Sequence, residues 1–519
     1  MQSFFEWFKA DPERQNKPWL ILGKGHSFSK RTQFDLQAYQ IFSLNHVVRE
    51  LPVTVSHIID YDVVEACGEA IERNAQVLVM PWIPHVKNKP GTLNLQEYAA
   101  KDSVLKRLNS QHRLLWYNAS TTSQHRPDSP VVQVVFFSVE AALNLLAIAG
   151  VRTVRSLGID GGNTYSATFD DLKEKTLLAN QVKSFDKQFE GIAKTLFTTG
   201  VNYAPLDIPS PIRVYVGATE EQMLSVKVLE YSIRKHASMS VEVFPLHRAG
   251  IDVPSPKDPK NHPRTPFTFQ RFLIPELAGY QGRAIYMDSD MQVLRDIRSL
   301  WTLPFLGADL LAVGAANRHR RPQFSVMLLN CDTLHWEINA LISALDNQEL
   351  SYEQMVHEMA VAKTIRTDID PSWNSLEQFK KGETALIHYT DMDTQPWVST
   401  ENPIGDIWIK DLIEAVTSGF IAVDEIKEQI QKGWIRPSLL YQIEHQIADS
   451  LLLPSIAHQL DKNFIAPYKM IDAQSGKVLS RFKRLKAAVR RHYQSTILFR
   501  LQRKLSQRLT RPKNLRSMA

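Results

Sequence analysis

The feature that most constrains the fold of this chain is an alternation of strand-like and helix-like segments. Five short apolar segments are separated by helical patterns in the first part of the chain: 17–28, 53–60, 75–82, 112–118 and 151–160. Strands that alternate with helices are typical of a mostly parallel sheet, because each parallel pair needs a crossover connection. The first part of the chain is therefore predicted to be an α/β domain.

The alternation then stops and starts again. Residues 167–207 are polar and helical in pattern and become irregular before Pro209 and Pro211, which indicates a domain boundary. Strand-like segments return at 212–219, 241–246 and 283–290, and only helical patterns follow residue 420. We therefore predict an α/β domain at 1–185, a linker at 186–207, a second α/β domain at 208–420 and a helical extension at 421–519. A length of 519 residues agrees with two or three domains.

Composition excludes several classes of protein. With 44% hydrophobic and 22% charged residues, the chain has the make-up of a folded globular protein. Its two cysteines, Cys67 and Cys331, cannot form a disulfide framework or a cysteine-rich zinc site.

The N-terminus lacks the pattern of a signal peptide, so we expect a cytoplasmic protein. The apolar stretch 131–151 contains Gln133, Glu140 and Asn144, which favours a buried strand and helix over a membrane span.

The positive charge lies at the C-terminus. Residues 477–519 contain 14 Lys or Arg and no Asp or Glu, and the whole chain carries +6, so the other 476 residues carry a net charge of −8. Apolar residues recur at near-helical spacing in this tail: Phe482, Leu485, Val489, Tyr493, Ile497, Leu501, Leu505 and Leu509. This pattern favours a helix on an anionic membrane surface, at the cytoplasmic face. A solvated, disordered tail is the simpler alternative. The tail has few aromatic residues that could stack on bases, which argues against nucleic-acid binding.

An acidic pair closes one predicted strand. The apolar run 284–287 ends at Asp288-Ser289-Asp290, and ligand sites of open α/β sheets lie at the carboxyl ends of strands. Two carboxylates there suit a divalent cation that also binds a diphosphate. Three other Asp-x-Asp pairs occur, Asp60/Asp62, Asp368/Asp370 and Asp391/Asp393, and an isolated pair more often caps a turn. The preceding strand favours Asp288 and Asp290.

Several segments together carry a resemblance to a known family. Residues 212–237, 269–294, 325–330 (SVMLLN), 370–377 (DPSWNSLE) and 385–397 (ALIHYTDMDTQPW) occur in the order of the family 8 retaining glycosyltransferases, which have the GT-A fold. The resemblance covers about residues 208–400. It implies a hexosyl-type glycosyltransferase of polysaccharide biosynthesis that moves a sugar from a UDP-sugar donor to a glycan or glycolipid acceptor.

The resemblance also implies roles for particular residues. Asp288, Asp290 and His388 would bind the metal, and a mixed carboxylate and imidazole set favours Mn²⁺ over Mg²⁺. Arg271 would lie near the diphosphate; the alternative is a surface arginine paired with Glu276. Residues implied to contact the nucleotide-sugar are Gly217, Ala218, Thr219, Arg271, Asp288, Ser289, Asn374 and Gln395. Gln354, or the nearby Glu353, would lie beside the anomeric carbon; an exposed helix face is the alternative for both.

The sequence departs from the family pattern at three places. Gln323, Phe324 and Ser325 stand where an Asn-Gly is usual, and Tyr-Glu-Gln at 352–354 stands where Asp-Gln-Asp is usual. Gln395 replaces the lysine of a Lys-Pro-Trp segment, which removes one positive charge from the expected diphosphate pocket. The donor sugar is therefore left open.

The first domain carries a second resemblance. Segments 22–28 (LGKGHSF), 43–48 (SLNHVV), 58–64 (IIDYDVV) and 137–165 together resemble bacterial sialyltransferase-like and MptE-like domains, which have a Rossmann-type fold. The resemblance implies a second nucleotide site at Gly23, Gly25, Ser27, Asn45, Gly158, Asp160 and Gly161. A tight strand-to-helix turn is the alternative for the two early glycines.

The predicted architecture is thus α/β, with two Rossmann-type domains, the first sialyltransferase-like and the second a GT-A nucleotide-diphospho-sugar transferase, followed by a helical basic tail. Two other functions stay open. The first domain could carry out CMP-sugar-type transfer, or the protein could be a non-catalytic, membrane-associated factor in glycan assembly.

Overall fold

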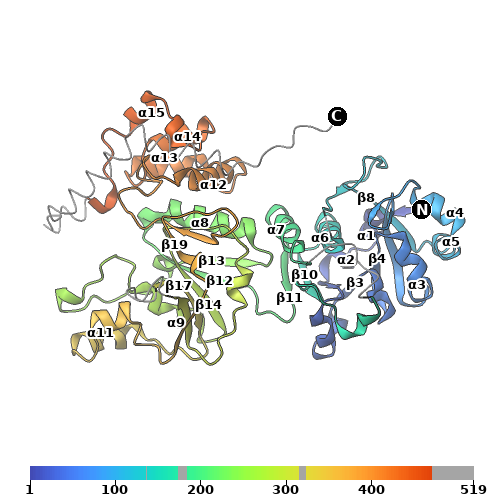
Figure 1. Cartoon of the computed structure of the whole chain (residues 1–519), viewed down its shortest axis with the longest axis horizontal. Helices are drawn as coiled ribbons and strands as arrows, with labels where there is room; N and C mark the ends of the chain where they lie inside the picture. Colours follow the sequence, from blue (N-terminus) through green and yellow to red (C-terminus); the bar gives the residue numbers. More distant parts are fainter. Residues whose placement is uncertain (136, 173–183, 315–322, 470–519) are drawn as a thin grey trace. The chain divides into compact units, whose positions relative to one another are not determined.

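The computed structural model describes residues 1–135, 137–172, 184–314 and 323–469 (Figure 1). The chain divides into two compact units. The first contains Met1–Ile212, Arg234–Glu242 and Asp296–Thr302, and the second contains Arg213–Ile233, Val243–Arg295 and the chain from Leu303 onward. The predicted basic tail from residue 477 lies outside the described residues. No described helix is long and apolar enough to cross a membrane.

The first unit is built on a parallel sheet, as predicted. The strands follow in the order β1 (Gln2–Ser3), β8 (Leu114–Ala119), β5 (Ala75–Pro81), β4 (Val53–His57), β3 (Gln40–Leu44), β2 (Trp19–Leu22), β10 (Thr153–Leu157) and β11 (Asn202–Pro205), and β9 (Val131–Val132) pairs with β8. All of these pairings are parallel. The chain leaves β2 toward β3 and later returns to β10 on the other side of β2. This change of direction is a topological switch point, where α/β sheets bind ligands.

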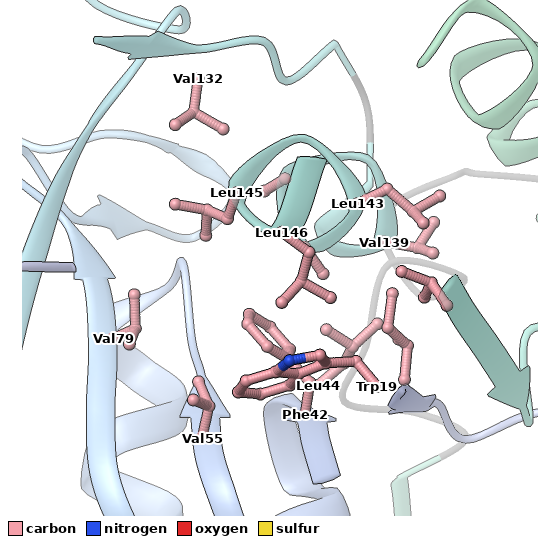
Figure 2. Close-up of a cluster of buried hydrophobic side chains, with 14 of the residues drawn as sticks. Trp19, Phe42, Leu44, Val55, Val79, Val132, Val139, Leu143, Leu145 and Leu146 are labelled. Carbon is pink, nitrogen blue, oxygen red and sulfur yellow. The ribbon is translucent and has the colours of Figure 1, made fainter. Parts of the chain in front are cut away.

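Alternate residues of the strands pack against opposite layers. Val77 and Val79 of β5 belong to a core with α6 (Ser138–Ile148), whereas Leu78 and Met80 belong to a core with α3 (Tyr61–Asn74). Figure 2 shows Leu146 of α6 pointing toward Trp19 of the sheet. The remaining helices of this unit are α1 (Phe4–Lys9), α2 (Glu13–Asn16), α4 (Leu95–Lys101), α5 (Ser103–Ser110), α7 (Gln188–Thr199) and α10 (Arg298–Trp301). The stretch 131–151 thus forms a strand and a helix, as its polar interruptions predicted.

The second unit contains a mixed sheet. Its order is β13 (Val241–Pro245), β12 (Ile212–Gly217), β14 (Arg283–Asp288), β17 (Gln323–Asn330), β16 (Leu310–Val313) and β18 (Ile365–Ile369). Strands β12 and β14 are parallel, and their last residues, Gly217 and Asp288, are register partners. A smaller sheet joins β15 (Met291–Val293), β20 (Leu386–His388) and β19 (Ser375–Leu376). The two sheets are thus linked through Ser289 and Asp290.

Helices complete the second unit. They are α8 (Met223–His236), α9 (Ile274–Leu277), α11 (Ile338–Asp346), α12 (Gly405–Thr417), α13 (Val423–Gln431), α14 (Ser438–Glu444) and α15 (Ser455–Leu460). Helices α12 to α15 form one group in Figure 1. No strand occurs among the described residues after His388, in agreement with the helical pattern of the sequence.

Candidate metal and nucleotide-sugar site

Asp288 and Asp290 lie close together where a strand ends. Asp288 is the last residue of β14, and the amide of Ser289 donates a hydrogen bond of 3.1 Å to the Gly217 carbonyl. The chain bends at Ser289 and Asp290 after the strand ends, and a carboxylate oxygen of Asp288 lies within 4.8 Å of one of Asp290. The Ser289 side chain is buried. The strand end therefore fixes the separation of the two carboxylates.

A histidine from a distant part of the sequence completes the cluster. His388 ends β20, which pairs with β15 and so lies beside Asp290. Its Nε2 lies 3.0 Å from Oδ1 of Asp290. One ligand atom from each of Asp288, Asp290 and His388 lies within 4.8 Å of the others, a spacing that a metal ion could bridge. Two carboxylates and one imidazole are a chemically suitable donor set for Mn²⁺ or Mg²⁺.

The close charges shift the pKa of these groups. Burial raises the pKa of Asp288, and the nearby Asp290 carboxylate raises it further, although Arg271 acts in the opposite direction. Burial alone would lower the pKa of His388, but the charge of Asp290 and its hydrogen bond outweigh this effect and raise the pKa. A cation between the carboxylates would relieve the repulsion between them.

Asn374 holds the imidazole from behind. Its Oδ1 lies 2.9 Å from Nδ1 of His388, and its Nδ2 donates to Oε1 of Gln323 over 2.5 Å. Both Asn374 and His388 are buried. Because Oδ1 can only accept, Nδ1 of His388 carries the proton and donates it to Asn374. With Nδ1 protonated, Nε2 is the nitrogen left to face the carboxylates; it donates to Asp290 while the imidazole is charged, and it would offer its lone pair to a metal ion once that proton is released.

Gln395 contacts the other side of Asp290. Its Nε2 donates to Oδ2 of Asp290 over 3.2 Å and to the Tyr389 carbonyl over 2.9 Å. This residue stands where the family pattern has a lysine. An amide here orients the carboxylate without adding a positive charge.

Arg271 is buried rather than on the surface, so the alternative of a surface pair with Glu276 is wrong. Its Nε and Nη1 donate to the carbonyls of Thr268 and Phe324, both over 3.0 Å. Its Nη2 lies 3.7 Å from Oδ1 of Asp288, and its guanidinium lies 4.6 Å from the centre of the Tyr286 ring. These contacts fix a permanent positive charge next to the acidic pair.

Tyr286 belongs to the site but was not identified from the sequence. Its hydroxyl donates to Oδ1 of Asp288 over 2.5 Å, and the ring is fully buried. The sequence spacing could have identified it, because Tyr286 precedes Asp288 by two residues in a strand and therefore points to the same side.

The three residues after β12 lie next to this strand end. A Cβ atom on Gly217 would lie 2.5 Å from the Tyr286 hydroxyl, so the tyrosine itself requires glycine there. The amide of Ala218 donates to Oε1 of Gln270 over 3.3 Å, and Thr219 forms a capping box with Gln222. The small residues are thus placed at the same edge as Asp288.

Glu353 and Gln354 do not join the cluster. They begin a five-residue π-helix, Glu353–His357, and the Gln354 side chain is exposed. Oε1 of Gln354 accepts a hydrogen bond of 2.9 Å from the Ser351 amide, which closes the local turn. Their proposed catalytic role stays a prediction.

The first unit contains a separate cavity of about 1040 Å³. It lies at the carboxyl ends of the strands around the switch point, and the predicted residues Gly23, Gly25, Asn45, Gly158 and Asp160 line it. Ser27 and Gly161 do not line it. Ser27 instead supports the wall, because its amide donates to Asp160 and its hydroxyl accepts from the Gly158 amide, each over 2.7 Å.

Close packing between two loops explains why glycines occur in this cavity. A Cβ on Gly23 would lie 2.3 Å from the Gly158 carbonyl oxygen, and one on Gly25 would lie 2.3 Å from Oδ2 of Asp160. Gly158 itself has a φ of +76°. These residues therefore let two loops touch, whether or not a ligand approaches. Lys24 also lines the cavity, with its ammonium 4.6 Å from the centre of the Tyr165 ring, and burial lowers its pKa to about 8.

The fold and the cluster define the second unit as a mixed α/β domain with a candidate metal site at its strand ends. Residues 215–352 match Glycosyl transferase family 8. The second unit therefore contains a glycosyltransferase domain. The match includes Asp288, Asp290 and Arg271, whereas His388 lies outside it.

Other relatives match parts of the chain. Protein CDI of Arabidopsis thaliana is 34% identical over 95 residues, which are 18% of this chain and 37% of that protein, so the chain spans little more than a third of this curated relative. Among solved structures, the WbbM bifunctional glycosyltransferase is 14% identical and covers 41% of this chain and 51% of its own, with a TM-score of 0.29. The galactosyltransferase LgtC, in complex with donor and acceptor sugar analogues, is 12% identical and covers 36% and 89%, with a TM-score of 0.26.

Proposed function

We propose that the second unit transfers a sugar from a UDP-sugar to a glycan or glycolipid acceptor, with Mn²⁺ and with retention of configuration. The observation that carries the proposal is the cluster of Asp288, Asp290 and His388 at the strand ends of a family 8 domain.

The described residues suit the charge that develops in such a transfer. A metal ion held by Asp288, Asp290 and His388 would offset the negative charge of the leaving nucleoside diphosphate. Arg271 adds a fixed positive charge 3.7 Å from Asp288, and its three contacts prevent it from moving into solvent. Such preorganised charges lower the barrier because they need no rearrangement during the reaction.

The test is hydrolysis of a panel of UDP- and CMP-sugars by the full-length protein, with Mn²⁺ or with EDTA. We expect manganese-dependent release of UDP from one donor and its loss in Asp288→Asn/Asp290→Asn. Asp368→Asn is the matched control, because Asp368 belongs to another Asp-x-Asp pair and contacts Arg366 at the surface. Release of UDP that persists in EDTA, or in the double variant, would contradict the proposal.

A second candidate function lies in the first unit, which we propose binds a nucleotide and carries out CMP-sugar-type transfer. The cavity at the switch point of a parallel sheet favours it. In the same panel, release of CMP that survives Asp288→Asn/Asp290→Asn would support it. The absence of both activities, and of donor binding by calorimetry, would favour a non-catalytic factor in glycan assembly.

We also propose that the protein works at the cytoplasmic face of a membrane in polysaccharide biosynthesis. Support comes from the 14 basic and no acidic residues of 477–519, which suit anionic lipid. Vesicle binding tests this proposal together with the inference that follows.

A further inference from the structure

Large exposed apolar side chains lie close together in the sequence near the end of the described chain. They are Leu451, Leu452, Ile456, Leu460 and Ile465, with exposed fractions from 40% for Leu451 to 69% for Leu452. Single exposed apolar residues are common on soluble proteins, but five within 15 residues indicate a surface that meets something apolar. We call these five residues the apolar face.

The fold holds this face outward. Ile456 and Leu460 are one turn apart on α15 and so lie on the same side of it, while Ala457 on the other side is buried. Behind the helix, the Ser438 amide and hydroxyl donate to the two carboxylate oxygens of Asp461, the former over 2.8 Å. Leu453 and Ala466 are also buried. The exposure therefore belongs to a packed element.

The surrounding charge selects the partner. The acidic residues near this segment are engaged: Asp449 accepts from the Leu451 amide, Asp461 from Ser438, and Asp393 pairs with Lys469. The sequence then continues into 477–519 with its 14 basic residues. A partner that matches both features must offer an apolar layer beneath negative charges. An anionic lipid bilayer does so, whereas a nucleic acid would leave the apolar face unused.

We infer that the apolar face docks on an anionic bilayer, where its five side chains enter the headgroup layer. This inference rests on the proposed membrane association and identifies a described surface that takes part in it. The apolar face and the basic segment 477–519 are each a weak membrane-binding signal. Together they would produce stable but reversible binding, which neither would give alone.

The experiment is co-sedimentation of the full-length protein with vesicles of phosphatidylcholine alone, or with about one third phosphatidylserine. We compare the wild type with Leu452→Ser/Ile456→Ser. Because both side chains are largely exposed, the variant should fold normally, which circular dichroism checks. The matched control is Leu306→Ser, because Leu306 is 68% exposed and distant in the sequence. Lys483→Gln/Arg484→Gln/Lys486→Gln tests the basic tail separately.

We expect binding to the anionic vesicles only, with partitioning weakened about tenfold in Leu452→Ser/Ile456→Ser and unchanged in Leu306→Ser. The tail variant should also bind more weakly. If the tail variant loses binding and Leu452→Ser/Ile456→Ser does not, membrane association stands and the apolar face is not part of it. A wild type that does not sediment, or that forms a dimer which Leu452→Ser/Ile456→Ser dissociates, overturns the inference in favour of no partner or a second copy.

Discussion

Replacement of Asn374 by Ala tests whether this residue prepares His388 to bind a metal. The substitution removes the acceptor 2.9 Å from Nδ1 of His388 and leaves the rest of the cluster in place. The buried imidazole then loses the contact that fixes its tautomer and its ring orientation. We expect the metal affinity to fall although no ligand has been changed.

The size of the effect follows from the contacts. One buried hydrogen bond contributes about 1 kcal/mol, and an unsatisfied buried donor costs about 1–3 kcal/mol. Loss of such a contact behind a metal ligand typically weakens metal binding about 10-fold to 100-fold. We therefore expect Mn²⁺ to dissociate about 10-fold to 100-fold more readily from Asn374→Ala, with a similar loss in donor hydrolysis.

The assay is titration of the protein with Mn²⁺, followed through the paramagnetic resonance signal of the free ion, without any sugar donor. Asn374→Asp keeps an acceptor for Nδ1 and should bind within about threefold of the wild type. Asn118→Ala removes an equally buried asparagine from the first unit and should not alter Mn²⁺ binding. Wild-type affinity in Asn374→Ala, or equal loss in Asn374→Asp, would refute the positioning role.

Three further predictions concern charge, acidity and backbone. Arg271→Met leaves the Asp288 carboxylate buried without its nearest cation, so we expect about 3 kcal/mol lower stability by denaturant unfolding and at least a 100-fold drop in donor hydrolysis; unchanged stability would contradict this. Burial lowers the pKa of His57 from 6.5 to about 3. Between pH 6.5 and pH 3 the imidazole is therefore protonated in the unfolded state but not in the folded state. Stability of the first unit should therefore fall by roughly 4 kcal/mol as the pH drops from 6.5 to 3, and His57→Gln should lessen this slope in acid unfolding. Gly158→Ala places a Cβ 2.2 Å from the Gly23 carbonyl oxygen at a φ of +76°, so the first unit should lose about 3 kcal/mol, seen as a lower melting temperature.

The general architecture could be predicted because it depends on local patterns. Continuous apolar runs such as 19–22 and 284–287 lie in strands, because residues buried on both faces read as uninterrupted apolar sequence. The mixed pairing of the second sheet was not predicted, since β17 is as apolar as a parallel strand but runs antiparallel to β14. Strand direction depends on the path of the connections, which apolar content does not encode.

The residues of the candidate site also fall into those that the sequence could predict and those that it could not. Asp288 and Asp290 are two residues apart, so sequence alone places them together once the strand is recognised. His388 lies about a hundred residues later, and only the resemblance to a family pointed to it. The contacts of Asn374 and Arg271 depend on side-chain packing, and the sequence could not show that Asn374 lies behind the imidazole.

The four Asp-x-Asp pairs show how context separates a site from a turn. Asp60 and Asp62 accept from the amides of Asn88 and Lys87, each over 2.7 Å, and so hold a loop. Asp370 caps Ser372, and Asp368 pairs with Arg366. Asp391 accepts from the Asp393 amide, and Asp393 contacts Lys469. Each of these pairs is partnered by backbone amides or by an exposed cation.

Asp288 and Asp290 differ in what faces them. Their contacts are the side chains of Tyr286, Arg271, Gln395 and His388, which come from separate parts of the chain. A turn needs only backbone amides, whereas this arrangement brings two carboxylate groups and an imidazole nitrogen within 4.8 Å of one another. Convergence of distant side chains costs conformational entropy and adds little to local folding. A metal ion bound between these groups offers a physical reason for this arrangement.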